Sequence, residues 1–127
     1  MEVTSIQKNV HSSPRKLRLV ADLVRKMKPA RALTTLEFTN RAAADDLAKA
    51  IKTALGNARQ QNLDEEKLAF AKLEVNEGIK MGRFQPGARG RVRPFRKKLS
   101  HIRIVLTEAA EAEPKVKKAK VTKKEEK

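Results

Sequence analysis

Apolar positions in the first half of the chain follow a helical period. Ser13-Pro14 supplies the hydroxyl and the proline that are typical of a helix start. The stripe that follows recurs every three or four residues and comprises Leu17, Leu19, Val20, Ala21, Leu23, Val24 and Met27. Pro29 ends this helix and begins a second one, whose inward-facing residues are Ala32, Leu33 and Leu36.

A longer third helix is predicted between Asn40 and about Gln61. Asn40 suits the N-cap position, the many alanines favour the helical state, and Asn62 can end the helix. Its apolar face consists of Leu47, Ile51, Ala54, Leu55 and Ala58. Before the helices, the β-branched residues among the first ten positions predict a strand.

The period changes to two after a polar turn at residues 64–66. Apolar residues occupy odd positions in one run (Leu73, Val75, Ile79, Met81) and even positions in a later run (Ile102, Ile104, Leu106). If both rows face one core, the numbers of paired residues add to an odd number. The loop between the runs then holds an even number of residues, unless a bulge intervenes. A tip near Arg89-Gly90 satisfies this condition and predicts a long hairpin arm over about residues 79–103.

One domain is predicted over residues 1–110, followed by a disordered lysine-rich tail over residues 111–127. The formal net charge is +15, from 30 Lys and Arg against 15 Asp and Glu. Without the tail from Pro114 onward, which holds seven Lys and two Glu, the charge is still +10. Such a field attracts phosphate backbones. The scarcity of aromatic residues argues against a platform that stacks single-stranded bases.

The arm concentrates this charge, because no Asp or Glu occurs between Gly78 and Thr107. The basic residues of this run, all candidates for phosphate contact, are Lys80, Arg83, Arg89, Arg91, Arg93, Arg96, Lys97, Lys98 and Arg103. In an extended chain Arg89, Arg91 and Arg93 share one face. Gly87 and Gly90 allow positive φ angles and close approach to a ligand. An isolated ribbon of this kind is marginally stable, so a surrounding polyanion is expected.

A second basic group on the first helix comprises Arg15, Lys16, Arg18, Arg25 and Lys26. Arg18 and Arg25 lie seven positions apart and therefore share a face. Each is either a solvated side chain or a contact to RNA, and Asp22 can pair with either arginine.

The sequence shows no pattern typical of an enzyme, a metal site or a nucleotide-binding loop. There is no cysteine, His11 and His101 lack the spacing of a metal site or triad, and no glycine-rich phosphate loop precedes a helix. We therefore expect no enzyme, cofactor or metal. No apolar run exceeds four residues and the start lacks a signal-peptide pattern, so a cytoplasmic protein without a membrane span is expected. No homo-oligomer is expected either, because no exposed apolar surface is evident.

Several motifs occur in an order and at separations that resemble the family of bacterial large-subunit ribosomal protein twenty-two, over roughly Val3 to Leu106. They are Ser13-Pro14-Arg15-Lys16 with Arg18, Val20, Ala21, Asp22 and Arg25; Ala54, Asn57 and Ala58; Glu77-Gly78; Ala88-Arg89-Gly90-Arg91; and Ser100-His101-Ile102. The family often has Arg-Gly-Lys where this chain has Arg25-Lys26-Met27, so the first helix is expected to end differently, at Pro29.

The resemblance implies an α+β fold in which three helices pack on a small three-stranded antiparallel sheet with a long protruding β-hairpin arm. It implies a structural protein that binds large-subunit ribosomal RNA, helps the subunit assemble and adjoins other large-subunit proteins. His101 joins Arg15, Lys16, Arg18, Arg25 and the arm cations in the implied RNA-binding set. The implied tip lines the peptide exit tunnel, meets the nascent peptide and comprises Gln85, Pro86, Gly87, Ala88, Arg89, Gly90 and Arg91. The alternative is a DNA-architectural protein whose arm enters the minor groove, with Pro86 or Pro94 as a wedge.

Overall fold

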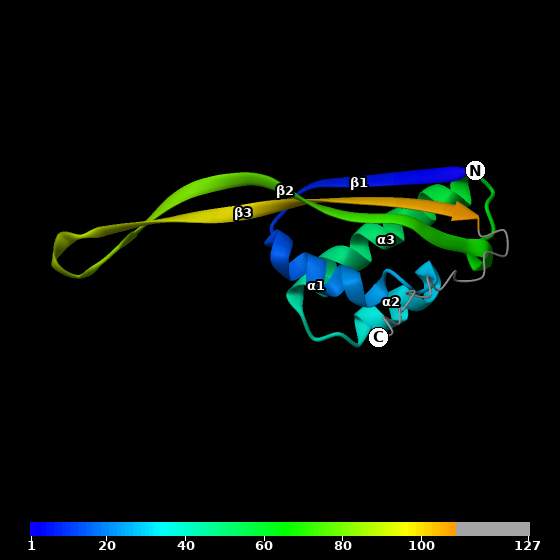
Figure 1. The fold of residues 1–127 in the computed structure, drawn as a ribbon, viewed down its shortest axis with the longest axis horizontal. Helices are drawn as coiled ribbons and strands as arrows, with labels where there is room; N and C mark the ends of the chain where they lie inside the picture. The colour runs from blue at the N-terminus through cyan, green and yellow to red at the C-terminus, as the bar shows by residue number, and fades with distance from the viewer. Residues whose placement is uncertain (109–127) are drawn as a thin grey trace, which may run out of the picture.

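The computed structural model describes residues 1–108, so the predicted tail over residues 111–127 lies outside the described part. Three antiparallel strands form one sheet in the order β1-β3-β2. The strands are β1 (Glu2–Val10), β2 (Leu68–Pro86) and β3 (Val92–Glu108), and the helices are α1 (Pro14–Val24), α2 (Pro29–Glu37) and α3 (Ala42–Gln60). Figure 1 shows the helices together on one side of the sheet, while β2 and β3 continue past the body as a twisted hairpin. The predicted α+β fold is confirmed.

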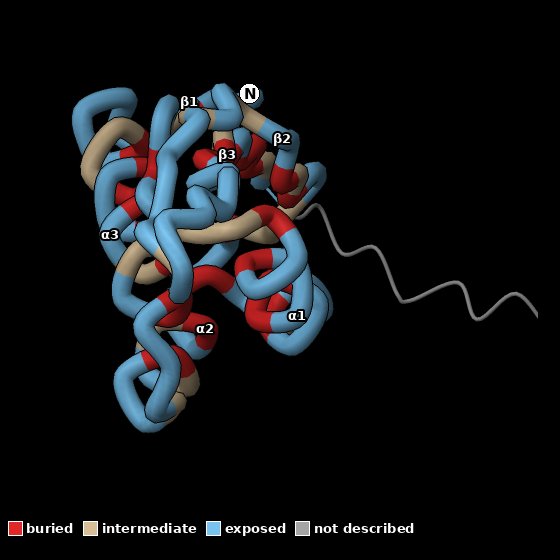
Figure 2. The backbone as a smooth tube through the Cα atoms, turned by 90° about the vertical axis from the view of Figure 1, so that its left-hand side faces the viewer, coloured by how far each residue is buried: buried red, intermediate tan, exposed pale blue. Residues whose placement is uncertain are grey.

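The core lies between the helices and the sheet, where Figure 2 shows the buried positions gathering. Leu47 and Ile51 of α3 and Ile102 of β3 are all 0% exposed. Leu17 of α1 is equally buried. The apolar residues that recur with the helical period and those that alternate along the strands thus pack in one core. The small alanines on the buried face of α3 allow close packing.

The predicted helix ends are right in part. Pro29 begins α2 as predicted, but α1 ends at Val24, so the expectation of an end at Pro29 was wrong. Arg41, whose backbone is extended, takes the N-cap of α3 in place of Asn40, and its carbonyl accepts the Ala44 N–H at 2.8 Å. Asn62 ends α3 as predicted. Its φ is 56°, and the next amide N–H reaches back to the Ala58 carbonyl at 3.1 Å.

The predicted apolar stripe of α1 was too wide. Leu19 and Leu23 are 62% and 47% exposed, whereas Met27 is half-buried against the core. At 100° per residue, positions two and six beyond Leu17 fall on the far side of the helix. The helix contacts the sheet and α3, and its buried residues are Pro14, Leu17, Val20, Ala21 and Val24.

A register shift separates the arm from the body. From Lys72 to Glu77, pairs such as Leu73↔Ile104 add to an odd number, as predicted, whereas the pairs before a first shift, from Leu68 to Phe70, add to an even number. Between Glu77 and Lys80 the register shifts by one, and the arm pairs from Lys80↔Lys98 to Pro86↔Val92 add to an even number. The tip is therefore a loop of five residues, 87–91. Ile79 lies beyond the last core-facing position of the body and is 61% exposed, so its predicted place in the core was wrong.

Candidate nucleic-acid interface

The register decides which side chains share a face of the arm, because directly opposed residues in an antiparallel pair point the same way. One face carries Lys80, Gly82, Phe84, Pro86, Val92, Pro94, Arg96 and Lys98. The other carries Met81, Arg83, Gln85, Arg93, Phe95 and Lys97. The first face is cationic near the body and apolar toward the tip, and the second mixes cations with apolar groups. Charge therefore occupies both sides of the ribbon, so a partner that neutralises it has to meet both sides.

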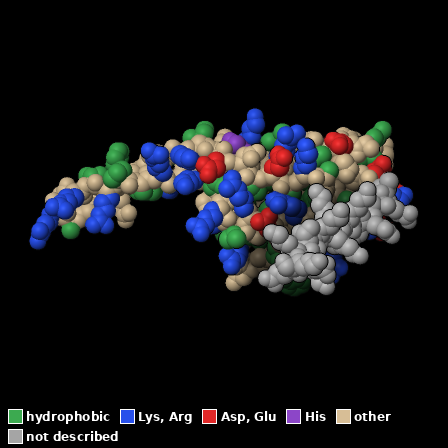
Figure 3. Space-filling view, in the orientation of Figure 1, with side chains coloured by type: hydrophobic (Ala, Val, Ile, Leu, Met, Phe, Trp, Pro, Cys, Tyr) green, Lys and Arg blue, Asp and Glu red, His purple; other side chains and the backbone are tan. Residues whose placement is uncertain are grey.

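The arm cations are exposed and mostly lack acidic partners. Within residues 1–108, the two ion pairs that involve the run are Lys80 with Glu77 at 3.0 Å and Arg103 with Glu74 at 4.0 Å. The other seven Lys and Arg of the run have no carboxylate within 4.0 Å in this part of the chain. Figure 3 shows basic side chains spread along the projection, with the visible acidic ones over the body and at its junction with the arm. This surface suits phosphate contacts.

The tip departs from the predicted extended chain. Ala88–Gly90 form a short 3-10 turn, so Arg89, Arg91 and Arg93 do not line one strand face; of these, Arg93 alone lies in β3. Gly90 has the predicted positive φ, at 69°, and Arg89 also does, at 58°. Gly87 has a φ of −114° instead. A side chain there would come within 2.9 Å of the Arg91 carbonyl, so close backbone packing explains this glycine.

Arg18 of α1 and Arg25, the residue that follows this helix, connect the helix to the sheet. Arg18 Nε donates to the Val75 carbonyl at 3.2 Å, and Arg25 Nη2 donates to the Leu73 carbonyl at 3.3 Å. Asp22 pairs with Arg25, at 3.0 Å. Both carbonyls lie on β2, which is an edge strand, so the arginines satisfy polar groups that pairing leaves free. A guanidinium has five N–H donors, which leaves each arginine able to contact phosphate as well.

A cluster of hydrogen bonds holds the junction of body and arm. His101 Nδ1 accepts the Asn9 N–H at 3.0 Å, so the neutral ring carries its proton on Nε2. Ser100 is 0% exposed and its Oγ donates to the Ser12 carbonyl at 2.5 Å. A Cβ on Gly78 would lie 3.0 Å from the Leu99 carbonyl oxygen, which is tighter than most such contacts, so this close strand approach favours glycine. Gly78, Ser100 and His101, which belong to the motifs of the family resemblance, therefore have a structural role at this junction. The Nε2–H group of His101 remains able to donate to a partner.

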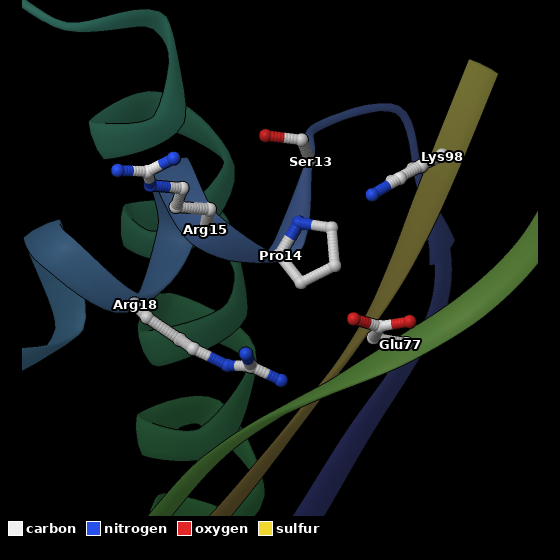
Figure 4. A pocket seen from close by; sticks show the side chains of 6 residues that line it. All are labelled: Ser13, Pro14, Arg15, Arg18, Glu77 and Lys98. Carbon is white, nitrogen blue, oxygen red and sulfur yellow. The ribbon is translucent and has the colours of Figure 1, made fainter. Parts of the chain in front are cut away.

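A hollow of about 370 Å³ opens beside this junction, between the start of α1 and the base of the arm. Its lining residues, shown in Figure 4, are Ser13, Pro14, Arg15, Arg18, Glu77 and Lys98. A hydrogen bond from Lys80, with the nearby charges of Lys80, Lys98 and Arg18, lowers the pKa of the Glu77 carboxyl below its ordinary value. Glu77 is thus ionised at neutral pH. Of the predicted RNA-binding residues, the hollow brings together Arg15, Arg18 and Lys98; Lys16 and Arg25 do not line it.

Sequence reasoning did not identify Glu77 as a candidate site residue, although it stands directly before the acid-free run. The signal that could have marked it is this position at the edge of the run. Within residues 1–108, no group of three or more His, Cys, Asp or Glu could hold a metal ion, and no helix is long and apolar enough to cross a membrane.

Comparison with known proteins assigns the family. The family model described as Ribosomal protein L22p/L17e matches residues 5–107. A relative from Pediococcus pentosaceus, named Large ribosomal subunit protein uL22, is 42% identical over 87% of this chain and 97% of its own. Proteins of the same name from Clostridioides difficile and Leptospira biflexa are each 43% identical over 85% of this chain, and over 98% and 95% of their own lengths. The resemblance drawn from the sequence motifs is therefore confirmed, and the chain belongs to the ribosomal protein L22p/L17e family.

Proposed function

We propose that this protein is a structural component of the large ribosomal subunit, where it binds ribosomal RNA and helps the subunit to assemble. The observation that carries the proposal is the arm, a ribbon with seven cations that lack acidic partners within residues 1–108. Phe84 and Val92 are 75% and 60% exposed, so nothing in the described residues 1–108 covers these apolar side chains of the ribbon. Ribosomal RNA would supply the counter-charge and a rigid framework.

The proposed RNA contacts follow the exposed cations from the body to the tip. The arm cations meet phosphates on both faces, and Arg15, Lys16, Arg18 and Arg25 continue the surface onto α1. His101 contributes the N–H of Nε2. Because bases inside duplex RNA are hard to reach, recognition is mainly of shape and backbone. The protein works as a monomer in the cytoplasmic ribosome beside other proteins of the large subunit, and the names of its relatives support that setting over the DNA-architectural alternative.

Binding to ribosomal RNA should depend steeply on salt. If all nine basic residues of the run meet phosphates, the slope of log K against log salt approaches roughly −6 to −8, at about 0.7–0.9 per contact. Fluorescence anisotropy with folded large-subunit RNA, between about 50 and 200 mM salt, measures this slope. A slope near −2, or a preference for duplex DNA at equal length, would contradict the proposal.

We further propose that the arm tip, residues 85–91, lines the peptide exit tunnel and meets the nascent peptide. Family resemblance motivates this placement, and the tip lies at the far end of the molecule from the body (Figure 1). A photoreactive amino acid at Ala88, in subunits reconstituted with this protein, should crosslink to a peptide during synthesis. The same group at exposed Lys49 of α3 serves as the control and should give no peptide crosslink. Equal labelling from both positions would refute the placement.

A further inference from the structure

The hollow at the base of the arm has the volume of a small binding site, yet its chemistry is not that of a simple phosphate site. Its volume of about 370 Å³ falls within the range of small-molecule sites, about 300–1,000 Å³. Arg15, Arg18 and Lys98 line it and favour an anion, but Glu77 lines it too. A carboxylate facing a phosphate costs free energy through repulsion. Its presence therefore indicates that the occupant also brings hydrogen-bond donors.

Glu77 has acceptor capacity left for such donors. An ionised carboxylate offers about four acceptor positions, and Lys80 is its single ion-pair partner in the described part of the chain, at 3.0 Å. The side chain is 47% exposed. Figure 4 shows its carboxylate between Pro14, Arg18 and Lys98, on the side of β2 that faces the start of α1.

The position of Glu77 is held by its surroundings. The register shift of β2 begins directly after it, and Gly78 packs closely against the Leu99 carbonyl. Across the ladder, its partner Ser100 is anchored to Ser12. On the opposite wall, Arg18 is fixed by its bond to the Val75 carbonyl. The backbone at Glu77 and the side chain of Arg18 therefore lose little freedom when the hollow is occupied.

We propose that this hollow receives a single nucleotide of the ribosomal RNA, with its phosphate on Arg18 and Lys98, whose side chains lie on the Glu77 side of the hollow in Figure 4, and a hydrogen-bond donor of the same nucleotide on the Glu77 carboxylate. RNA offers two kinds of donor to a carboxylate: the amino or imino groups of a base, and the ribose 2′-hydroxyl. Glu77 thus selects the correct RNA segment, whereas the surrounding cations supply affinity. The inference rests on the proposed function and assigns a specific contact within it.

The test asks whether removal of the Glu77 charge strengthens or weakens binding to RNA. Removing a negative charge from a surface that binds RNA should strengthen binding unless the carboxylate itself makes a favourable contact. Glu74→Gln is the matched control, because Glu74 also lies on β2, is 44% exposed and faces Arg103 at 4.0 Å, but it is outside the hollow. We expect Glu74→Gln to tighten or leave unchanged the binding of both folded large-subunit RNA and a generic RNA duplex.

Glu77→Gln should tighten binding of the generic duplex and weaken binding of the large-subunit RNA by about tenfold, the size of one good base contact. Glu77→Asp keeps the charge but withdraws the oxygens by one methylene, so it should also weaken that binding. If Glu77→Gln instead strengthens binding to large-subunit RNA as the control does, the inference is overturned. The proposed function would still stand if the unaltered protein binds that RNA with its steep salt dependence.

Analogue interference distinguishes the two donor sources. Pools of large-subunit RNA fragments would carry single 2′-deoxy nucleotides, or single base analogues that lack one amino group, at random positions. A position where the analogue weakens binding of the unaltered protein, but not of Glu77→Gln, identifies the contacted nucleotide. Interference by 2′-deoxy assigns the ribose, and interference by a base analogue assigns the base. If no position shows interference that depends on Glu77, the inference is wrong.

Discussion

Replacing Arg89, Arg91 and Arg93 together by glutamine is expected to weaken binding to large-subunit RNA by at least about a hundredfold. A charge-assisted hydrogen bond contributes about 1.5–3 kcal/mol, and these three exposed residues near the tip have no acidic partner within residues 1–108. The slope of log K against log salt should become shallower by roughly 2–3, at about 0.7–0.9 per lost contact. Anisotropy titrations at several salt concentrations measure both quantities.

The control removes the same charge from another place. Arg31, Arg41 and Lys49 are exposed, lie on or beside α2 and α3, and are not among the proposed contacts. Replacing these three by glutamine should change binding far less. Equal losses in both triple variants would show that net charge alone, and not the arm, governs binding. The melting temperature of the tip variant should stay unchanged, because the tip does not contact the core.

Ile102→Ala is expected to destabilise the body by about 2–5 kcal/mol, which is a large share of the stability of a small domain. Ile102 is 0% exposed and lies on β3, the central strand, paired with Gln7 on one side and Val75 on the other. Alanine would leave a cavity that these neighbours cannot fill. Urea unfolding followed by circular dichroism gives the free energy of unfolding.

Ile79→Ala is the matched control, since it makes the same truncation in a strand of the same sheet. Ile79 is 61% exposed at the start of the arm, so the free energy of unfolding should change by less than about 0.5 kcal/mol. A loss comparable to that of Ile102→Ala would mean that the arm packs into the core. The boundary between body and arm at the register shift would then be misplaced.

The helices were predictable because their signals are local. Proline at positions 14 and 29 and an asparagine at position 62 mark ends that depend on the backbone of one or two residues. The predictions of buried residues were wrong where burial depends on which other element packs against the residue. Leu19 and Leu23 are as apolar as Leu17, and the placement of the sheet on one side of α1 leaves them exposed. Ile79 fits the period of its strand, but it lies at the register shift between Glu77 and Lys80, where the arm begins, and is exposed.

The candidate site was predictable as a region and not as a set of contacts. The acid-free run identifies the arm cations directly from composition. No pattern in α1 indicates that Arg18 donates to a carbonyl 57 positions away, or that Arg25 does the same across 48. Glu77 belongs to the Glu77-Gly78 motif, but nothing in the sequence indicates which side chains its carboxylate meets. Folding makes it the acid of a cationic hollow, with Arg15 from α1 and Lys98 from β3.

By itself, the sequence determined the α+β class, the cationic arm and the family, because hydrophobic period, local charge and ordered motifs are properties of neighbouring residues. The tertiary structure alone decided the two faces of the arm, the five-residue tip and the hollow at its base. A shift of one residue in register turns every later pair of side chains to the opposite face. That shift coincides with the close approach of Gly78 to β3 and lies beside the anchored Ser100, and these contacts join segments that are distant in the sequence.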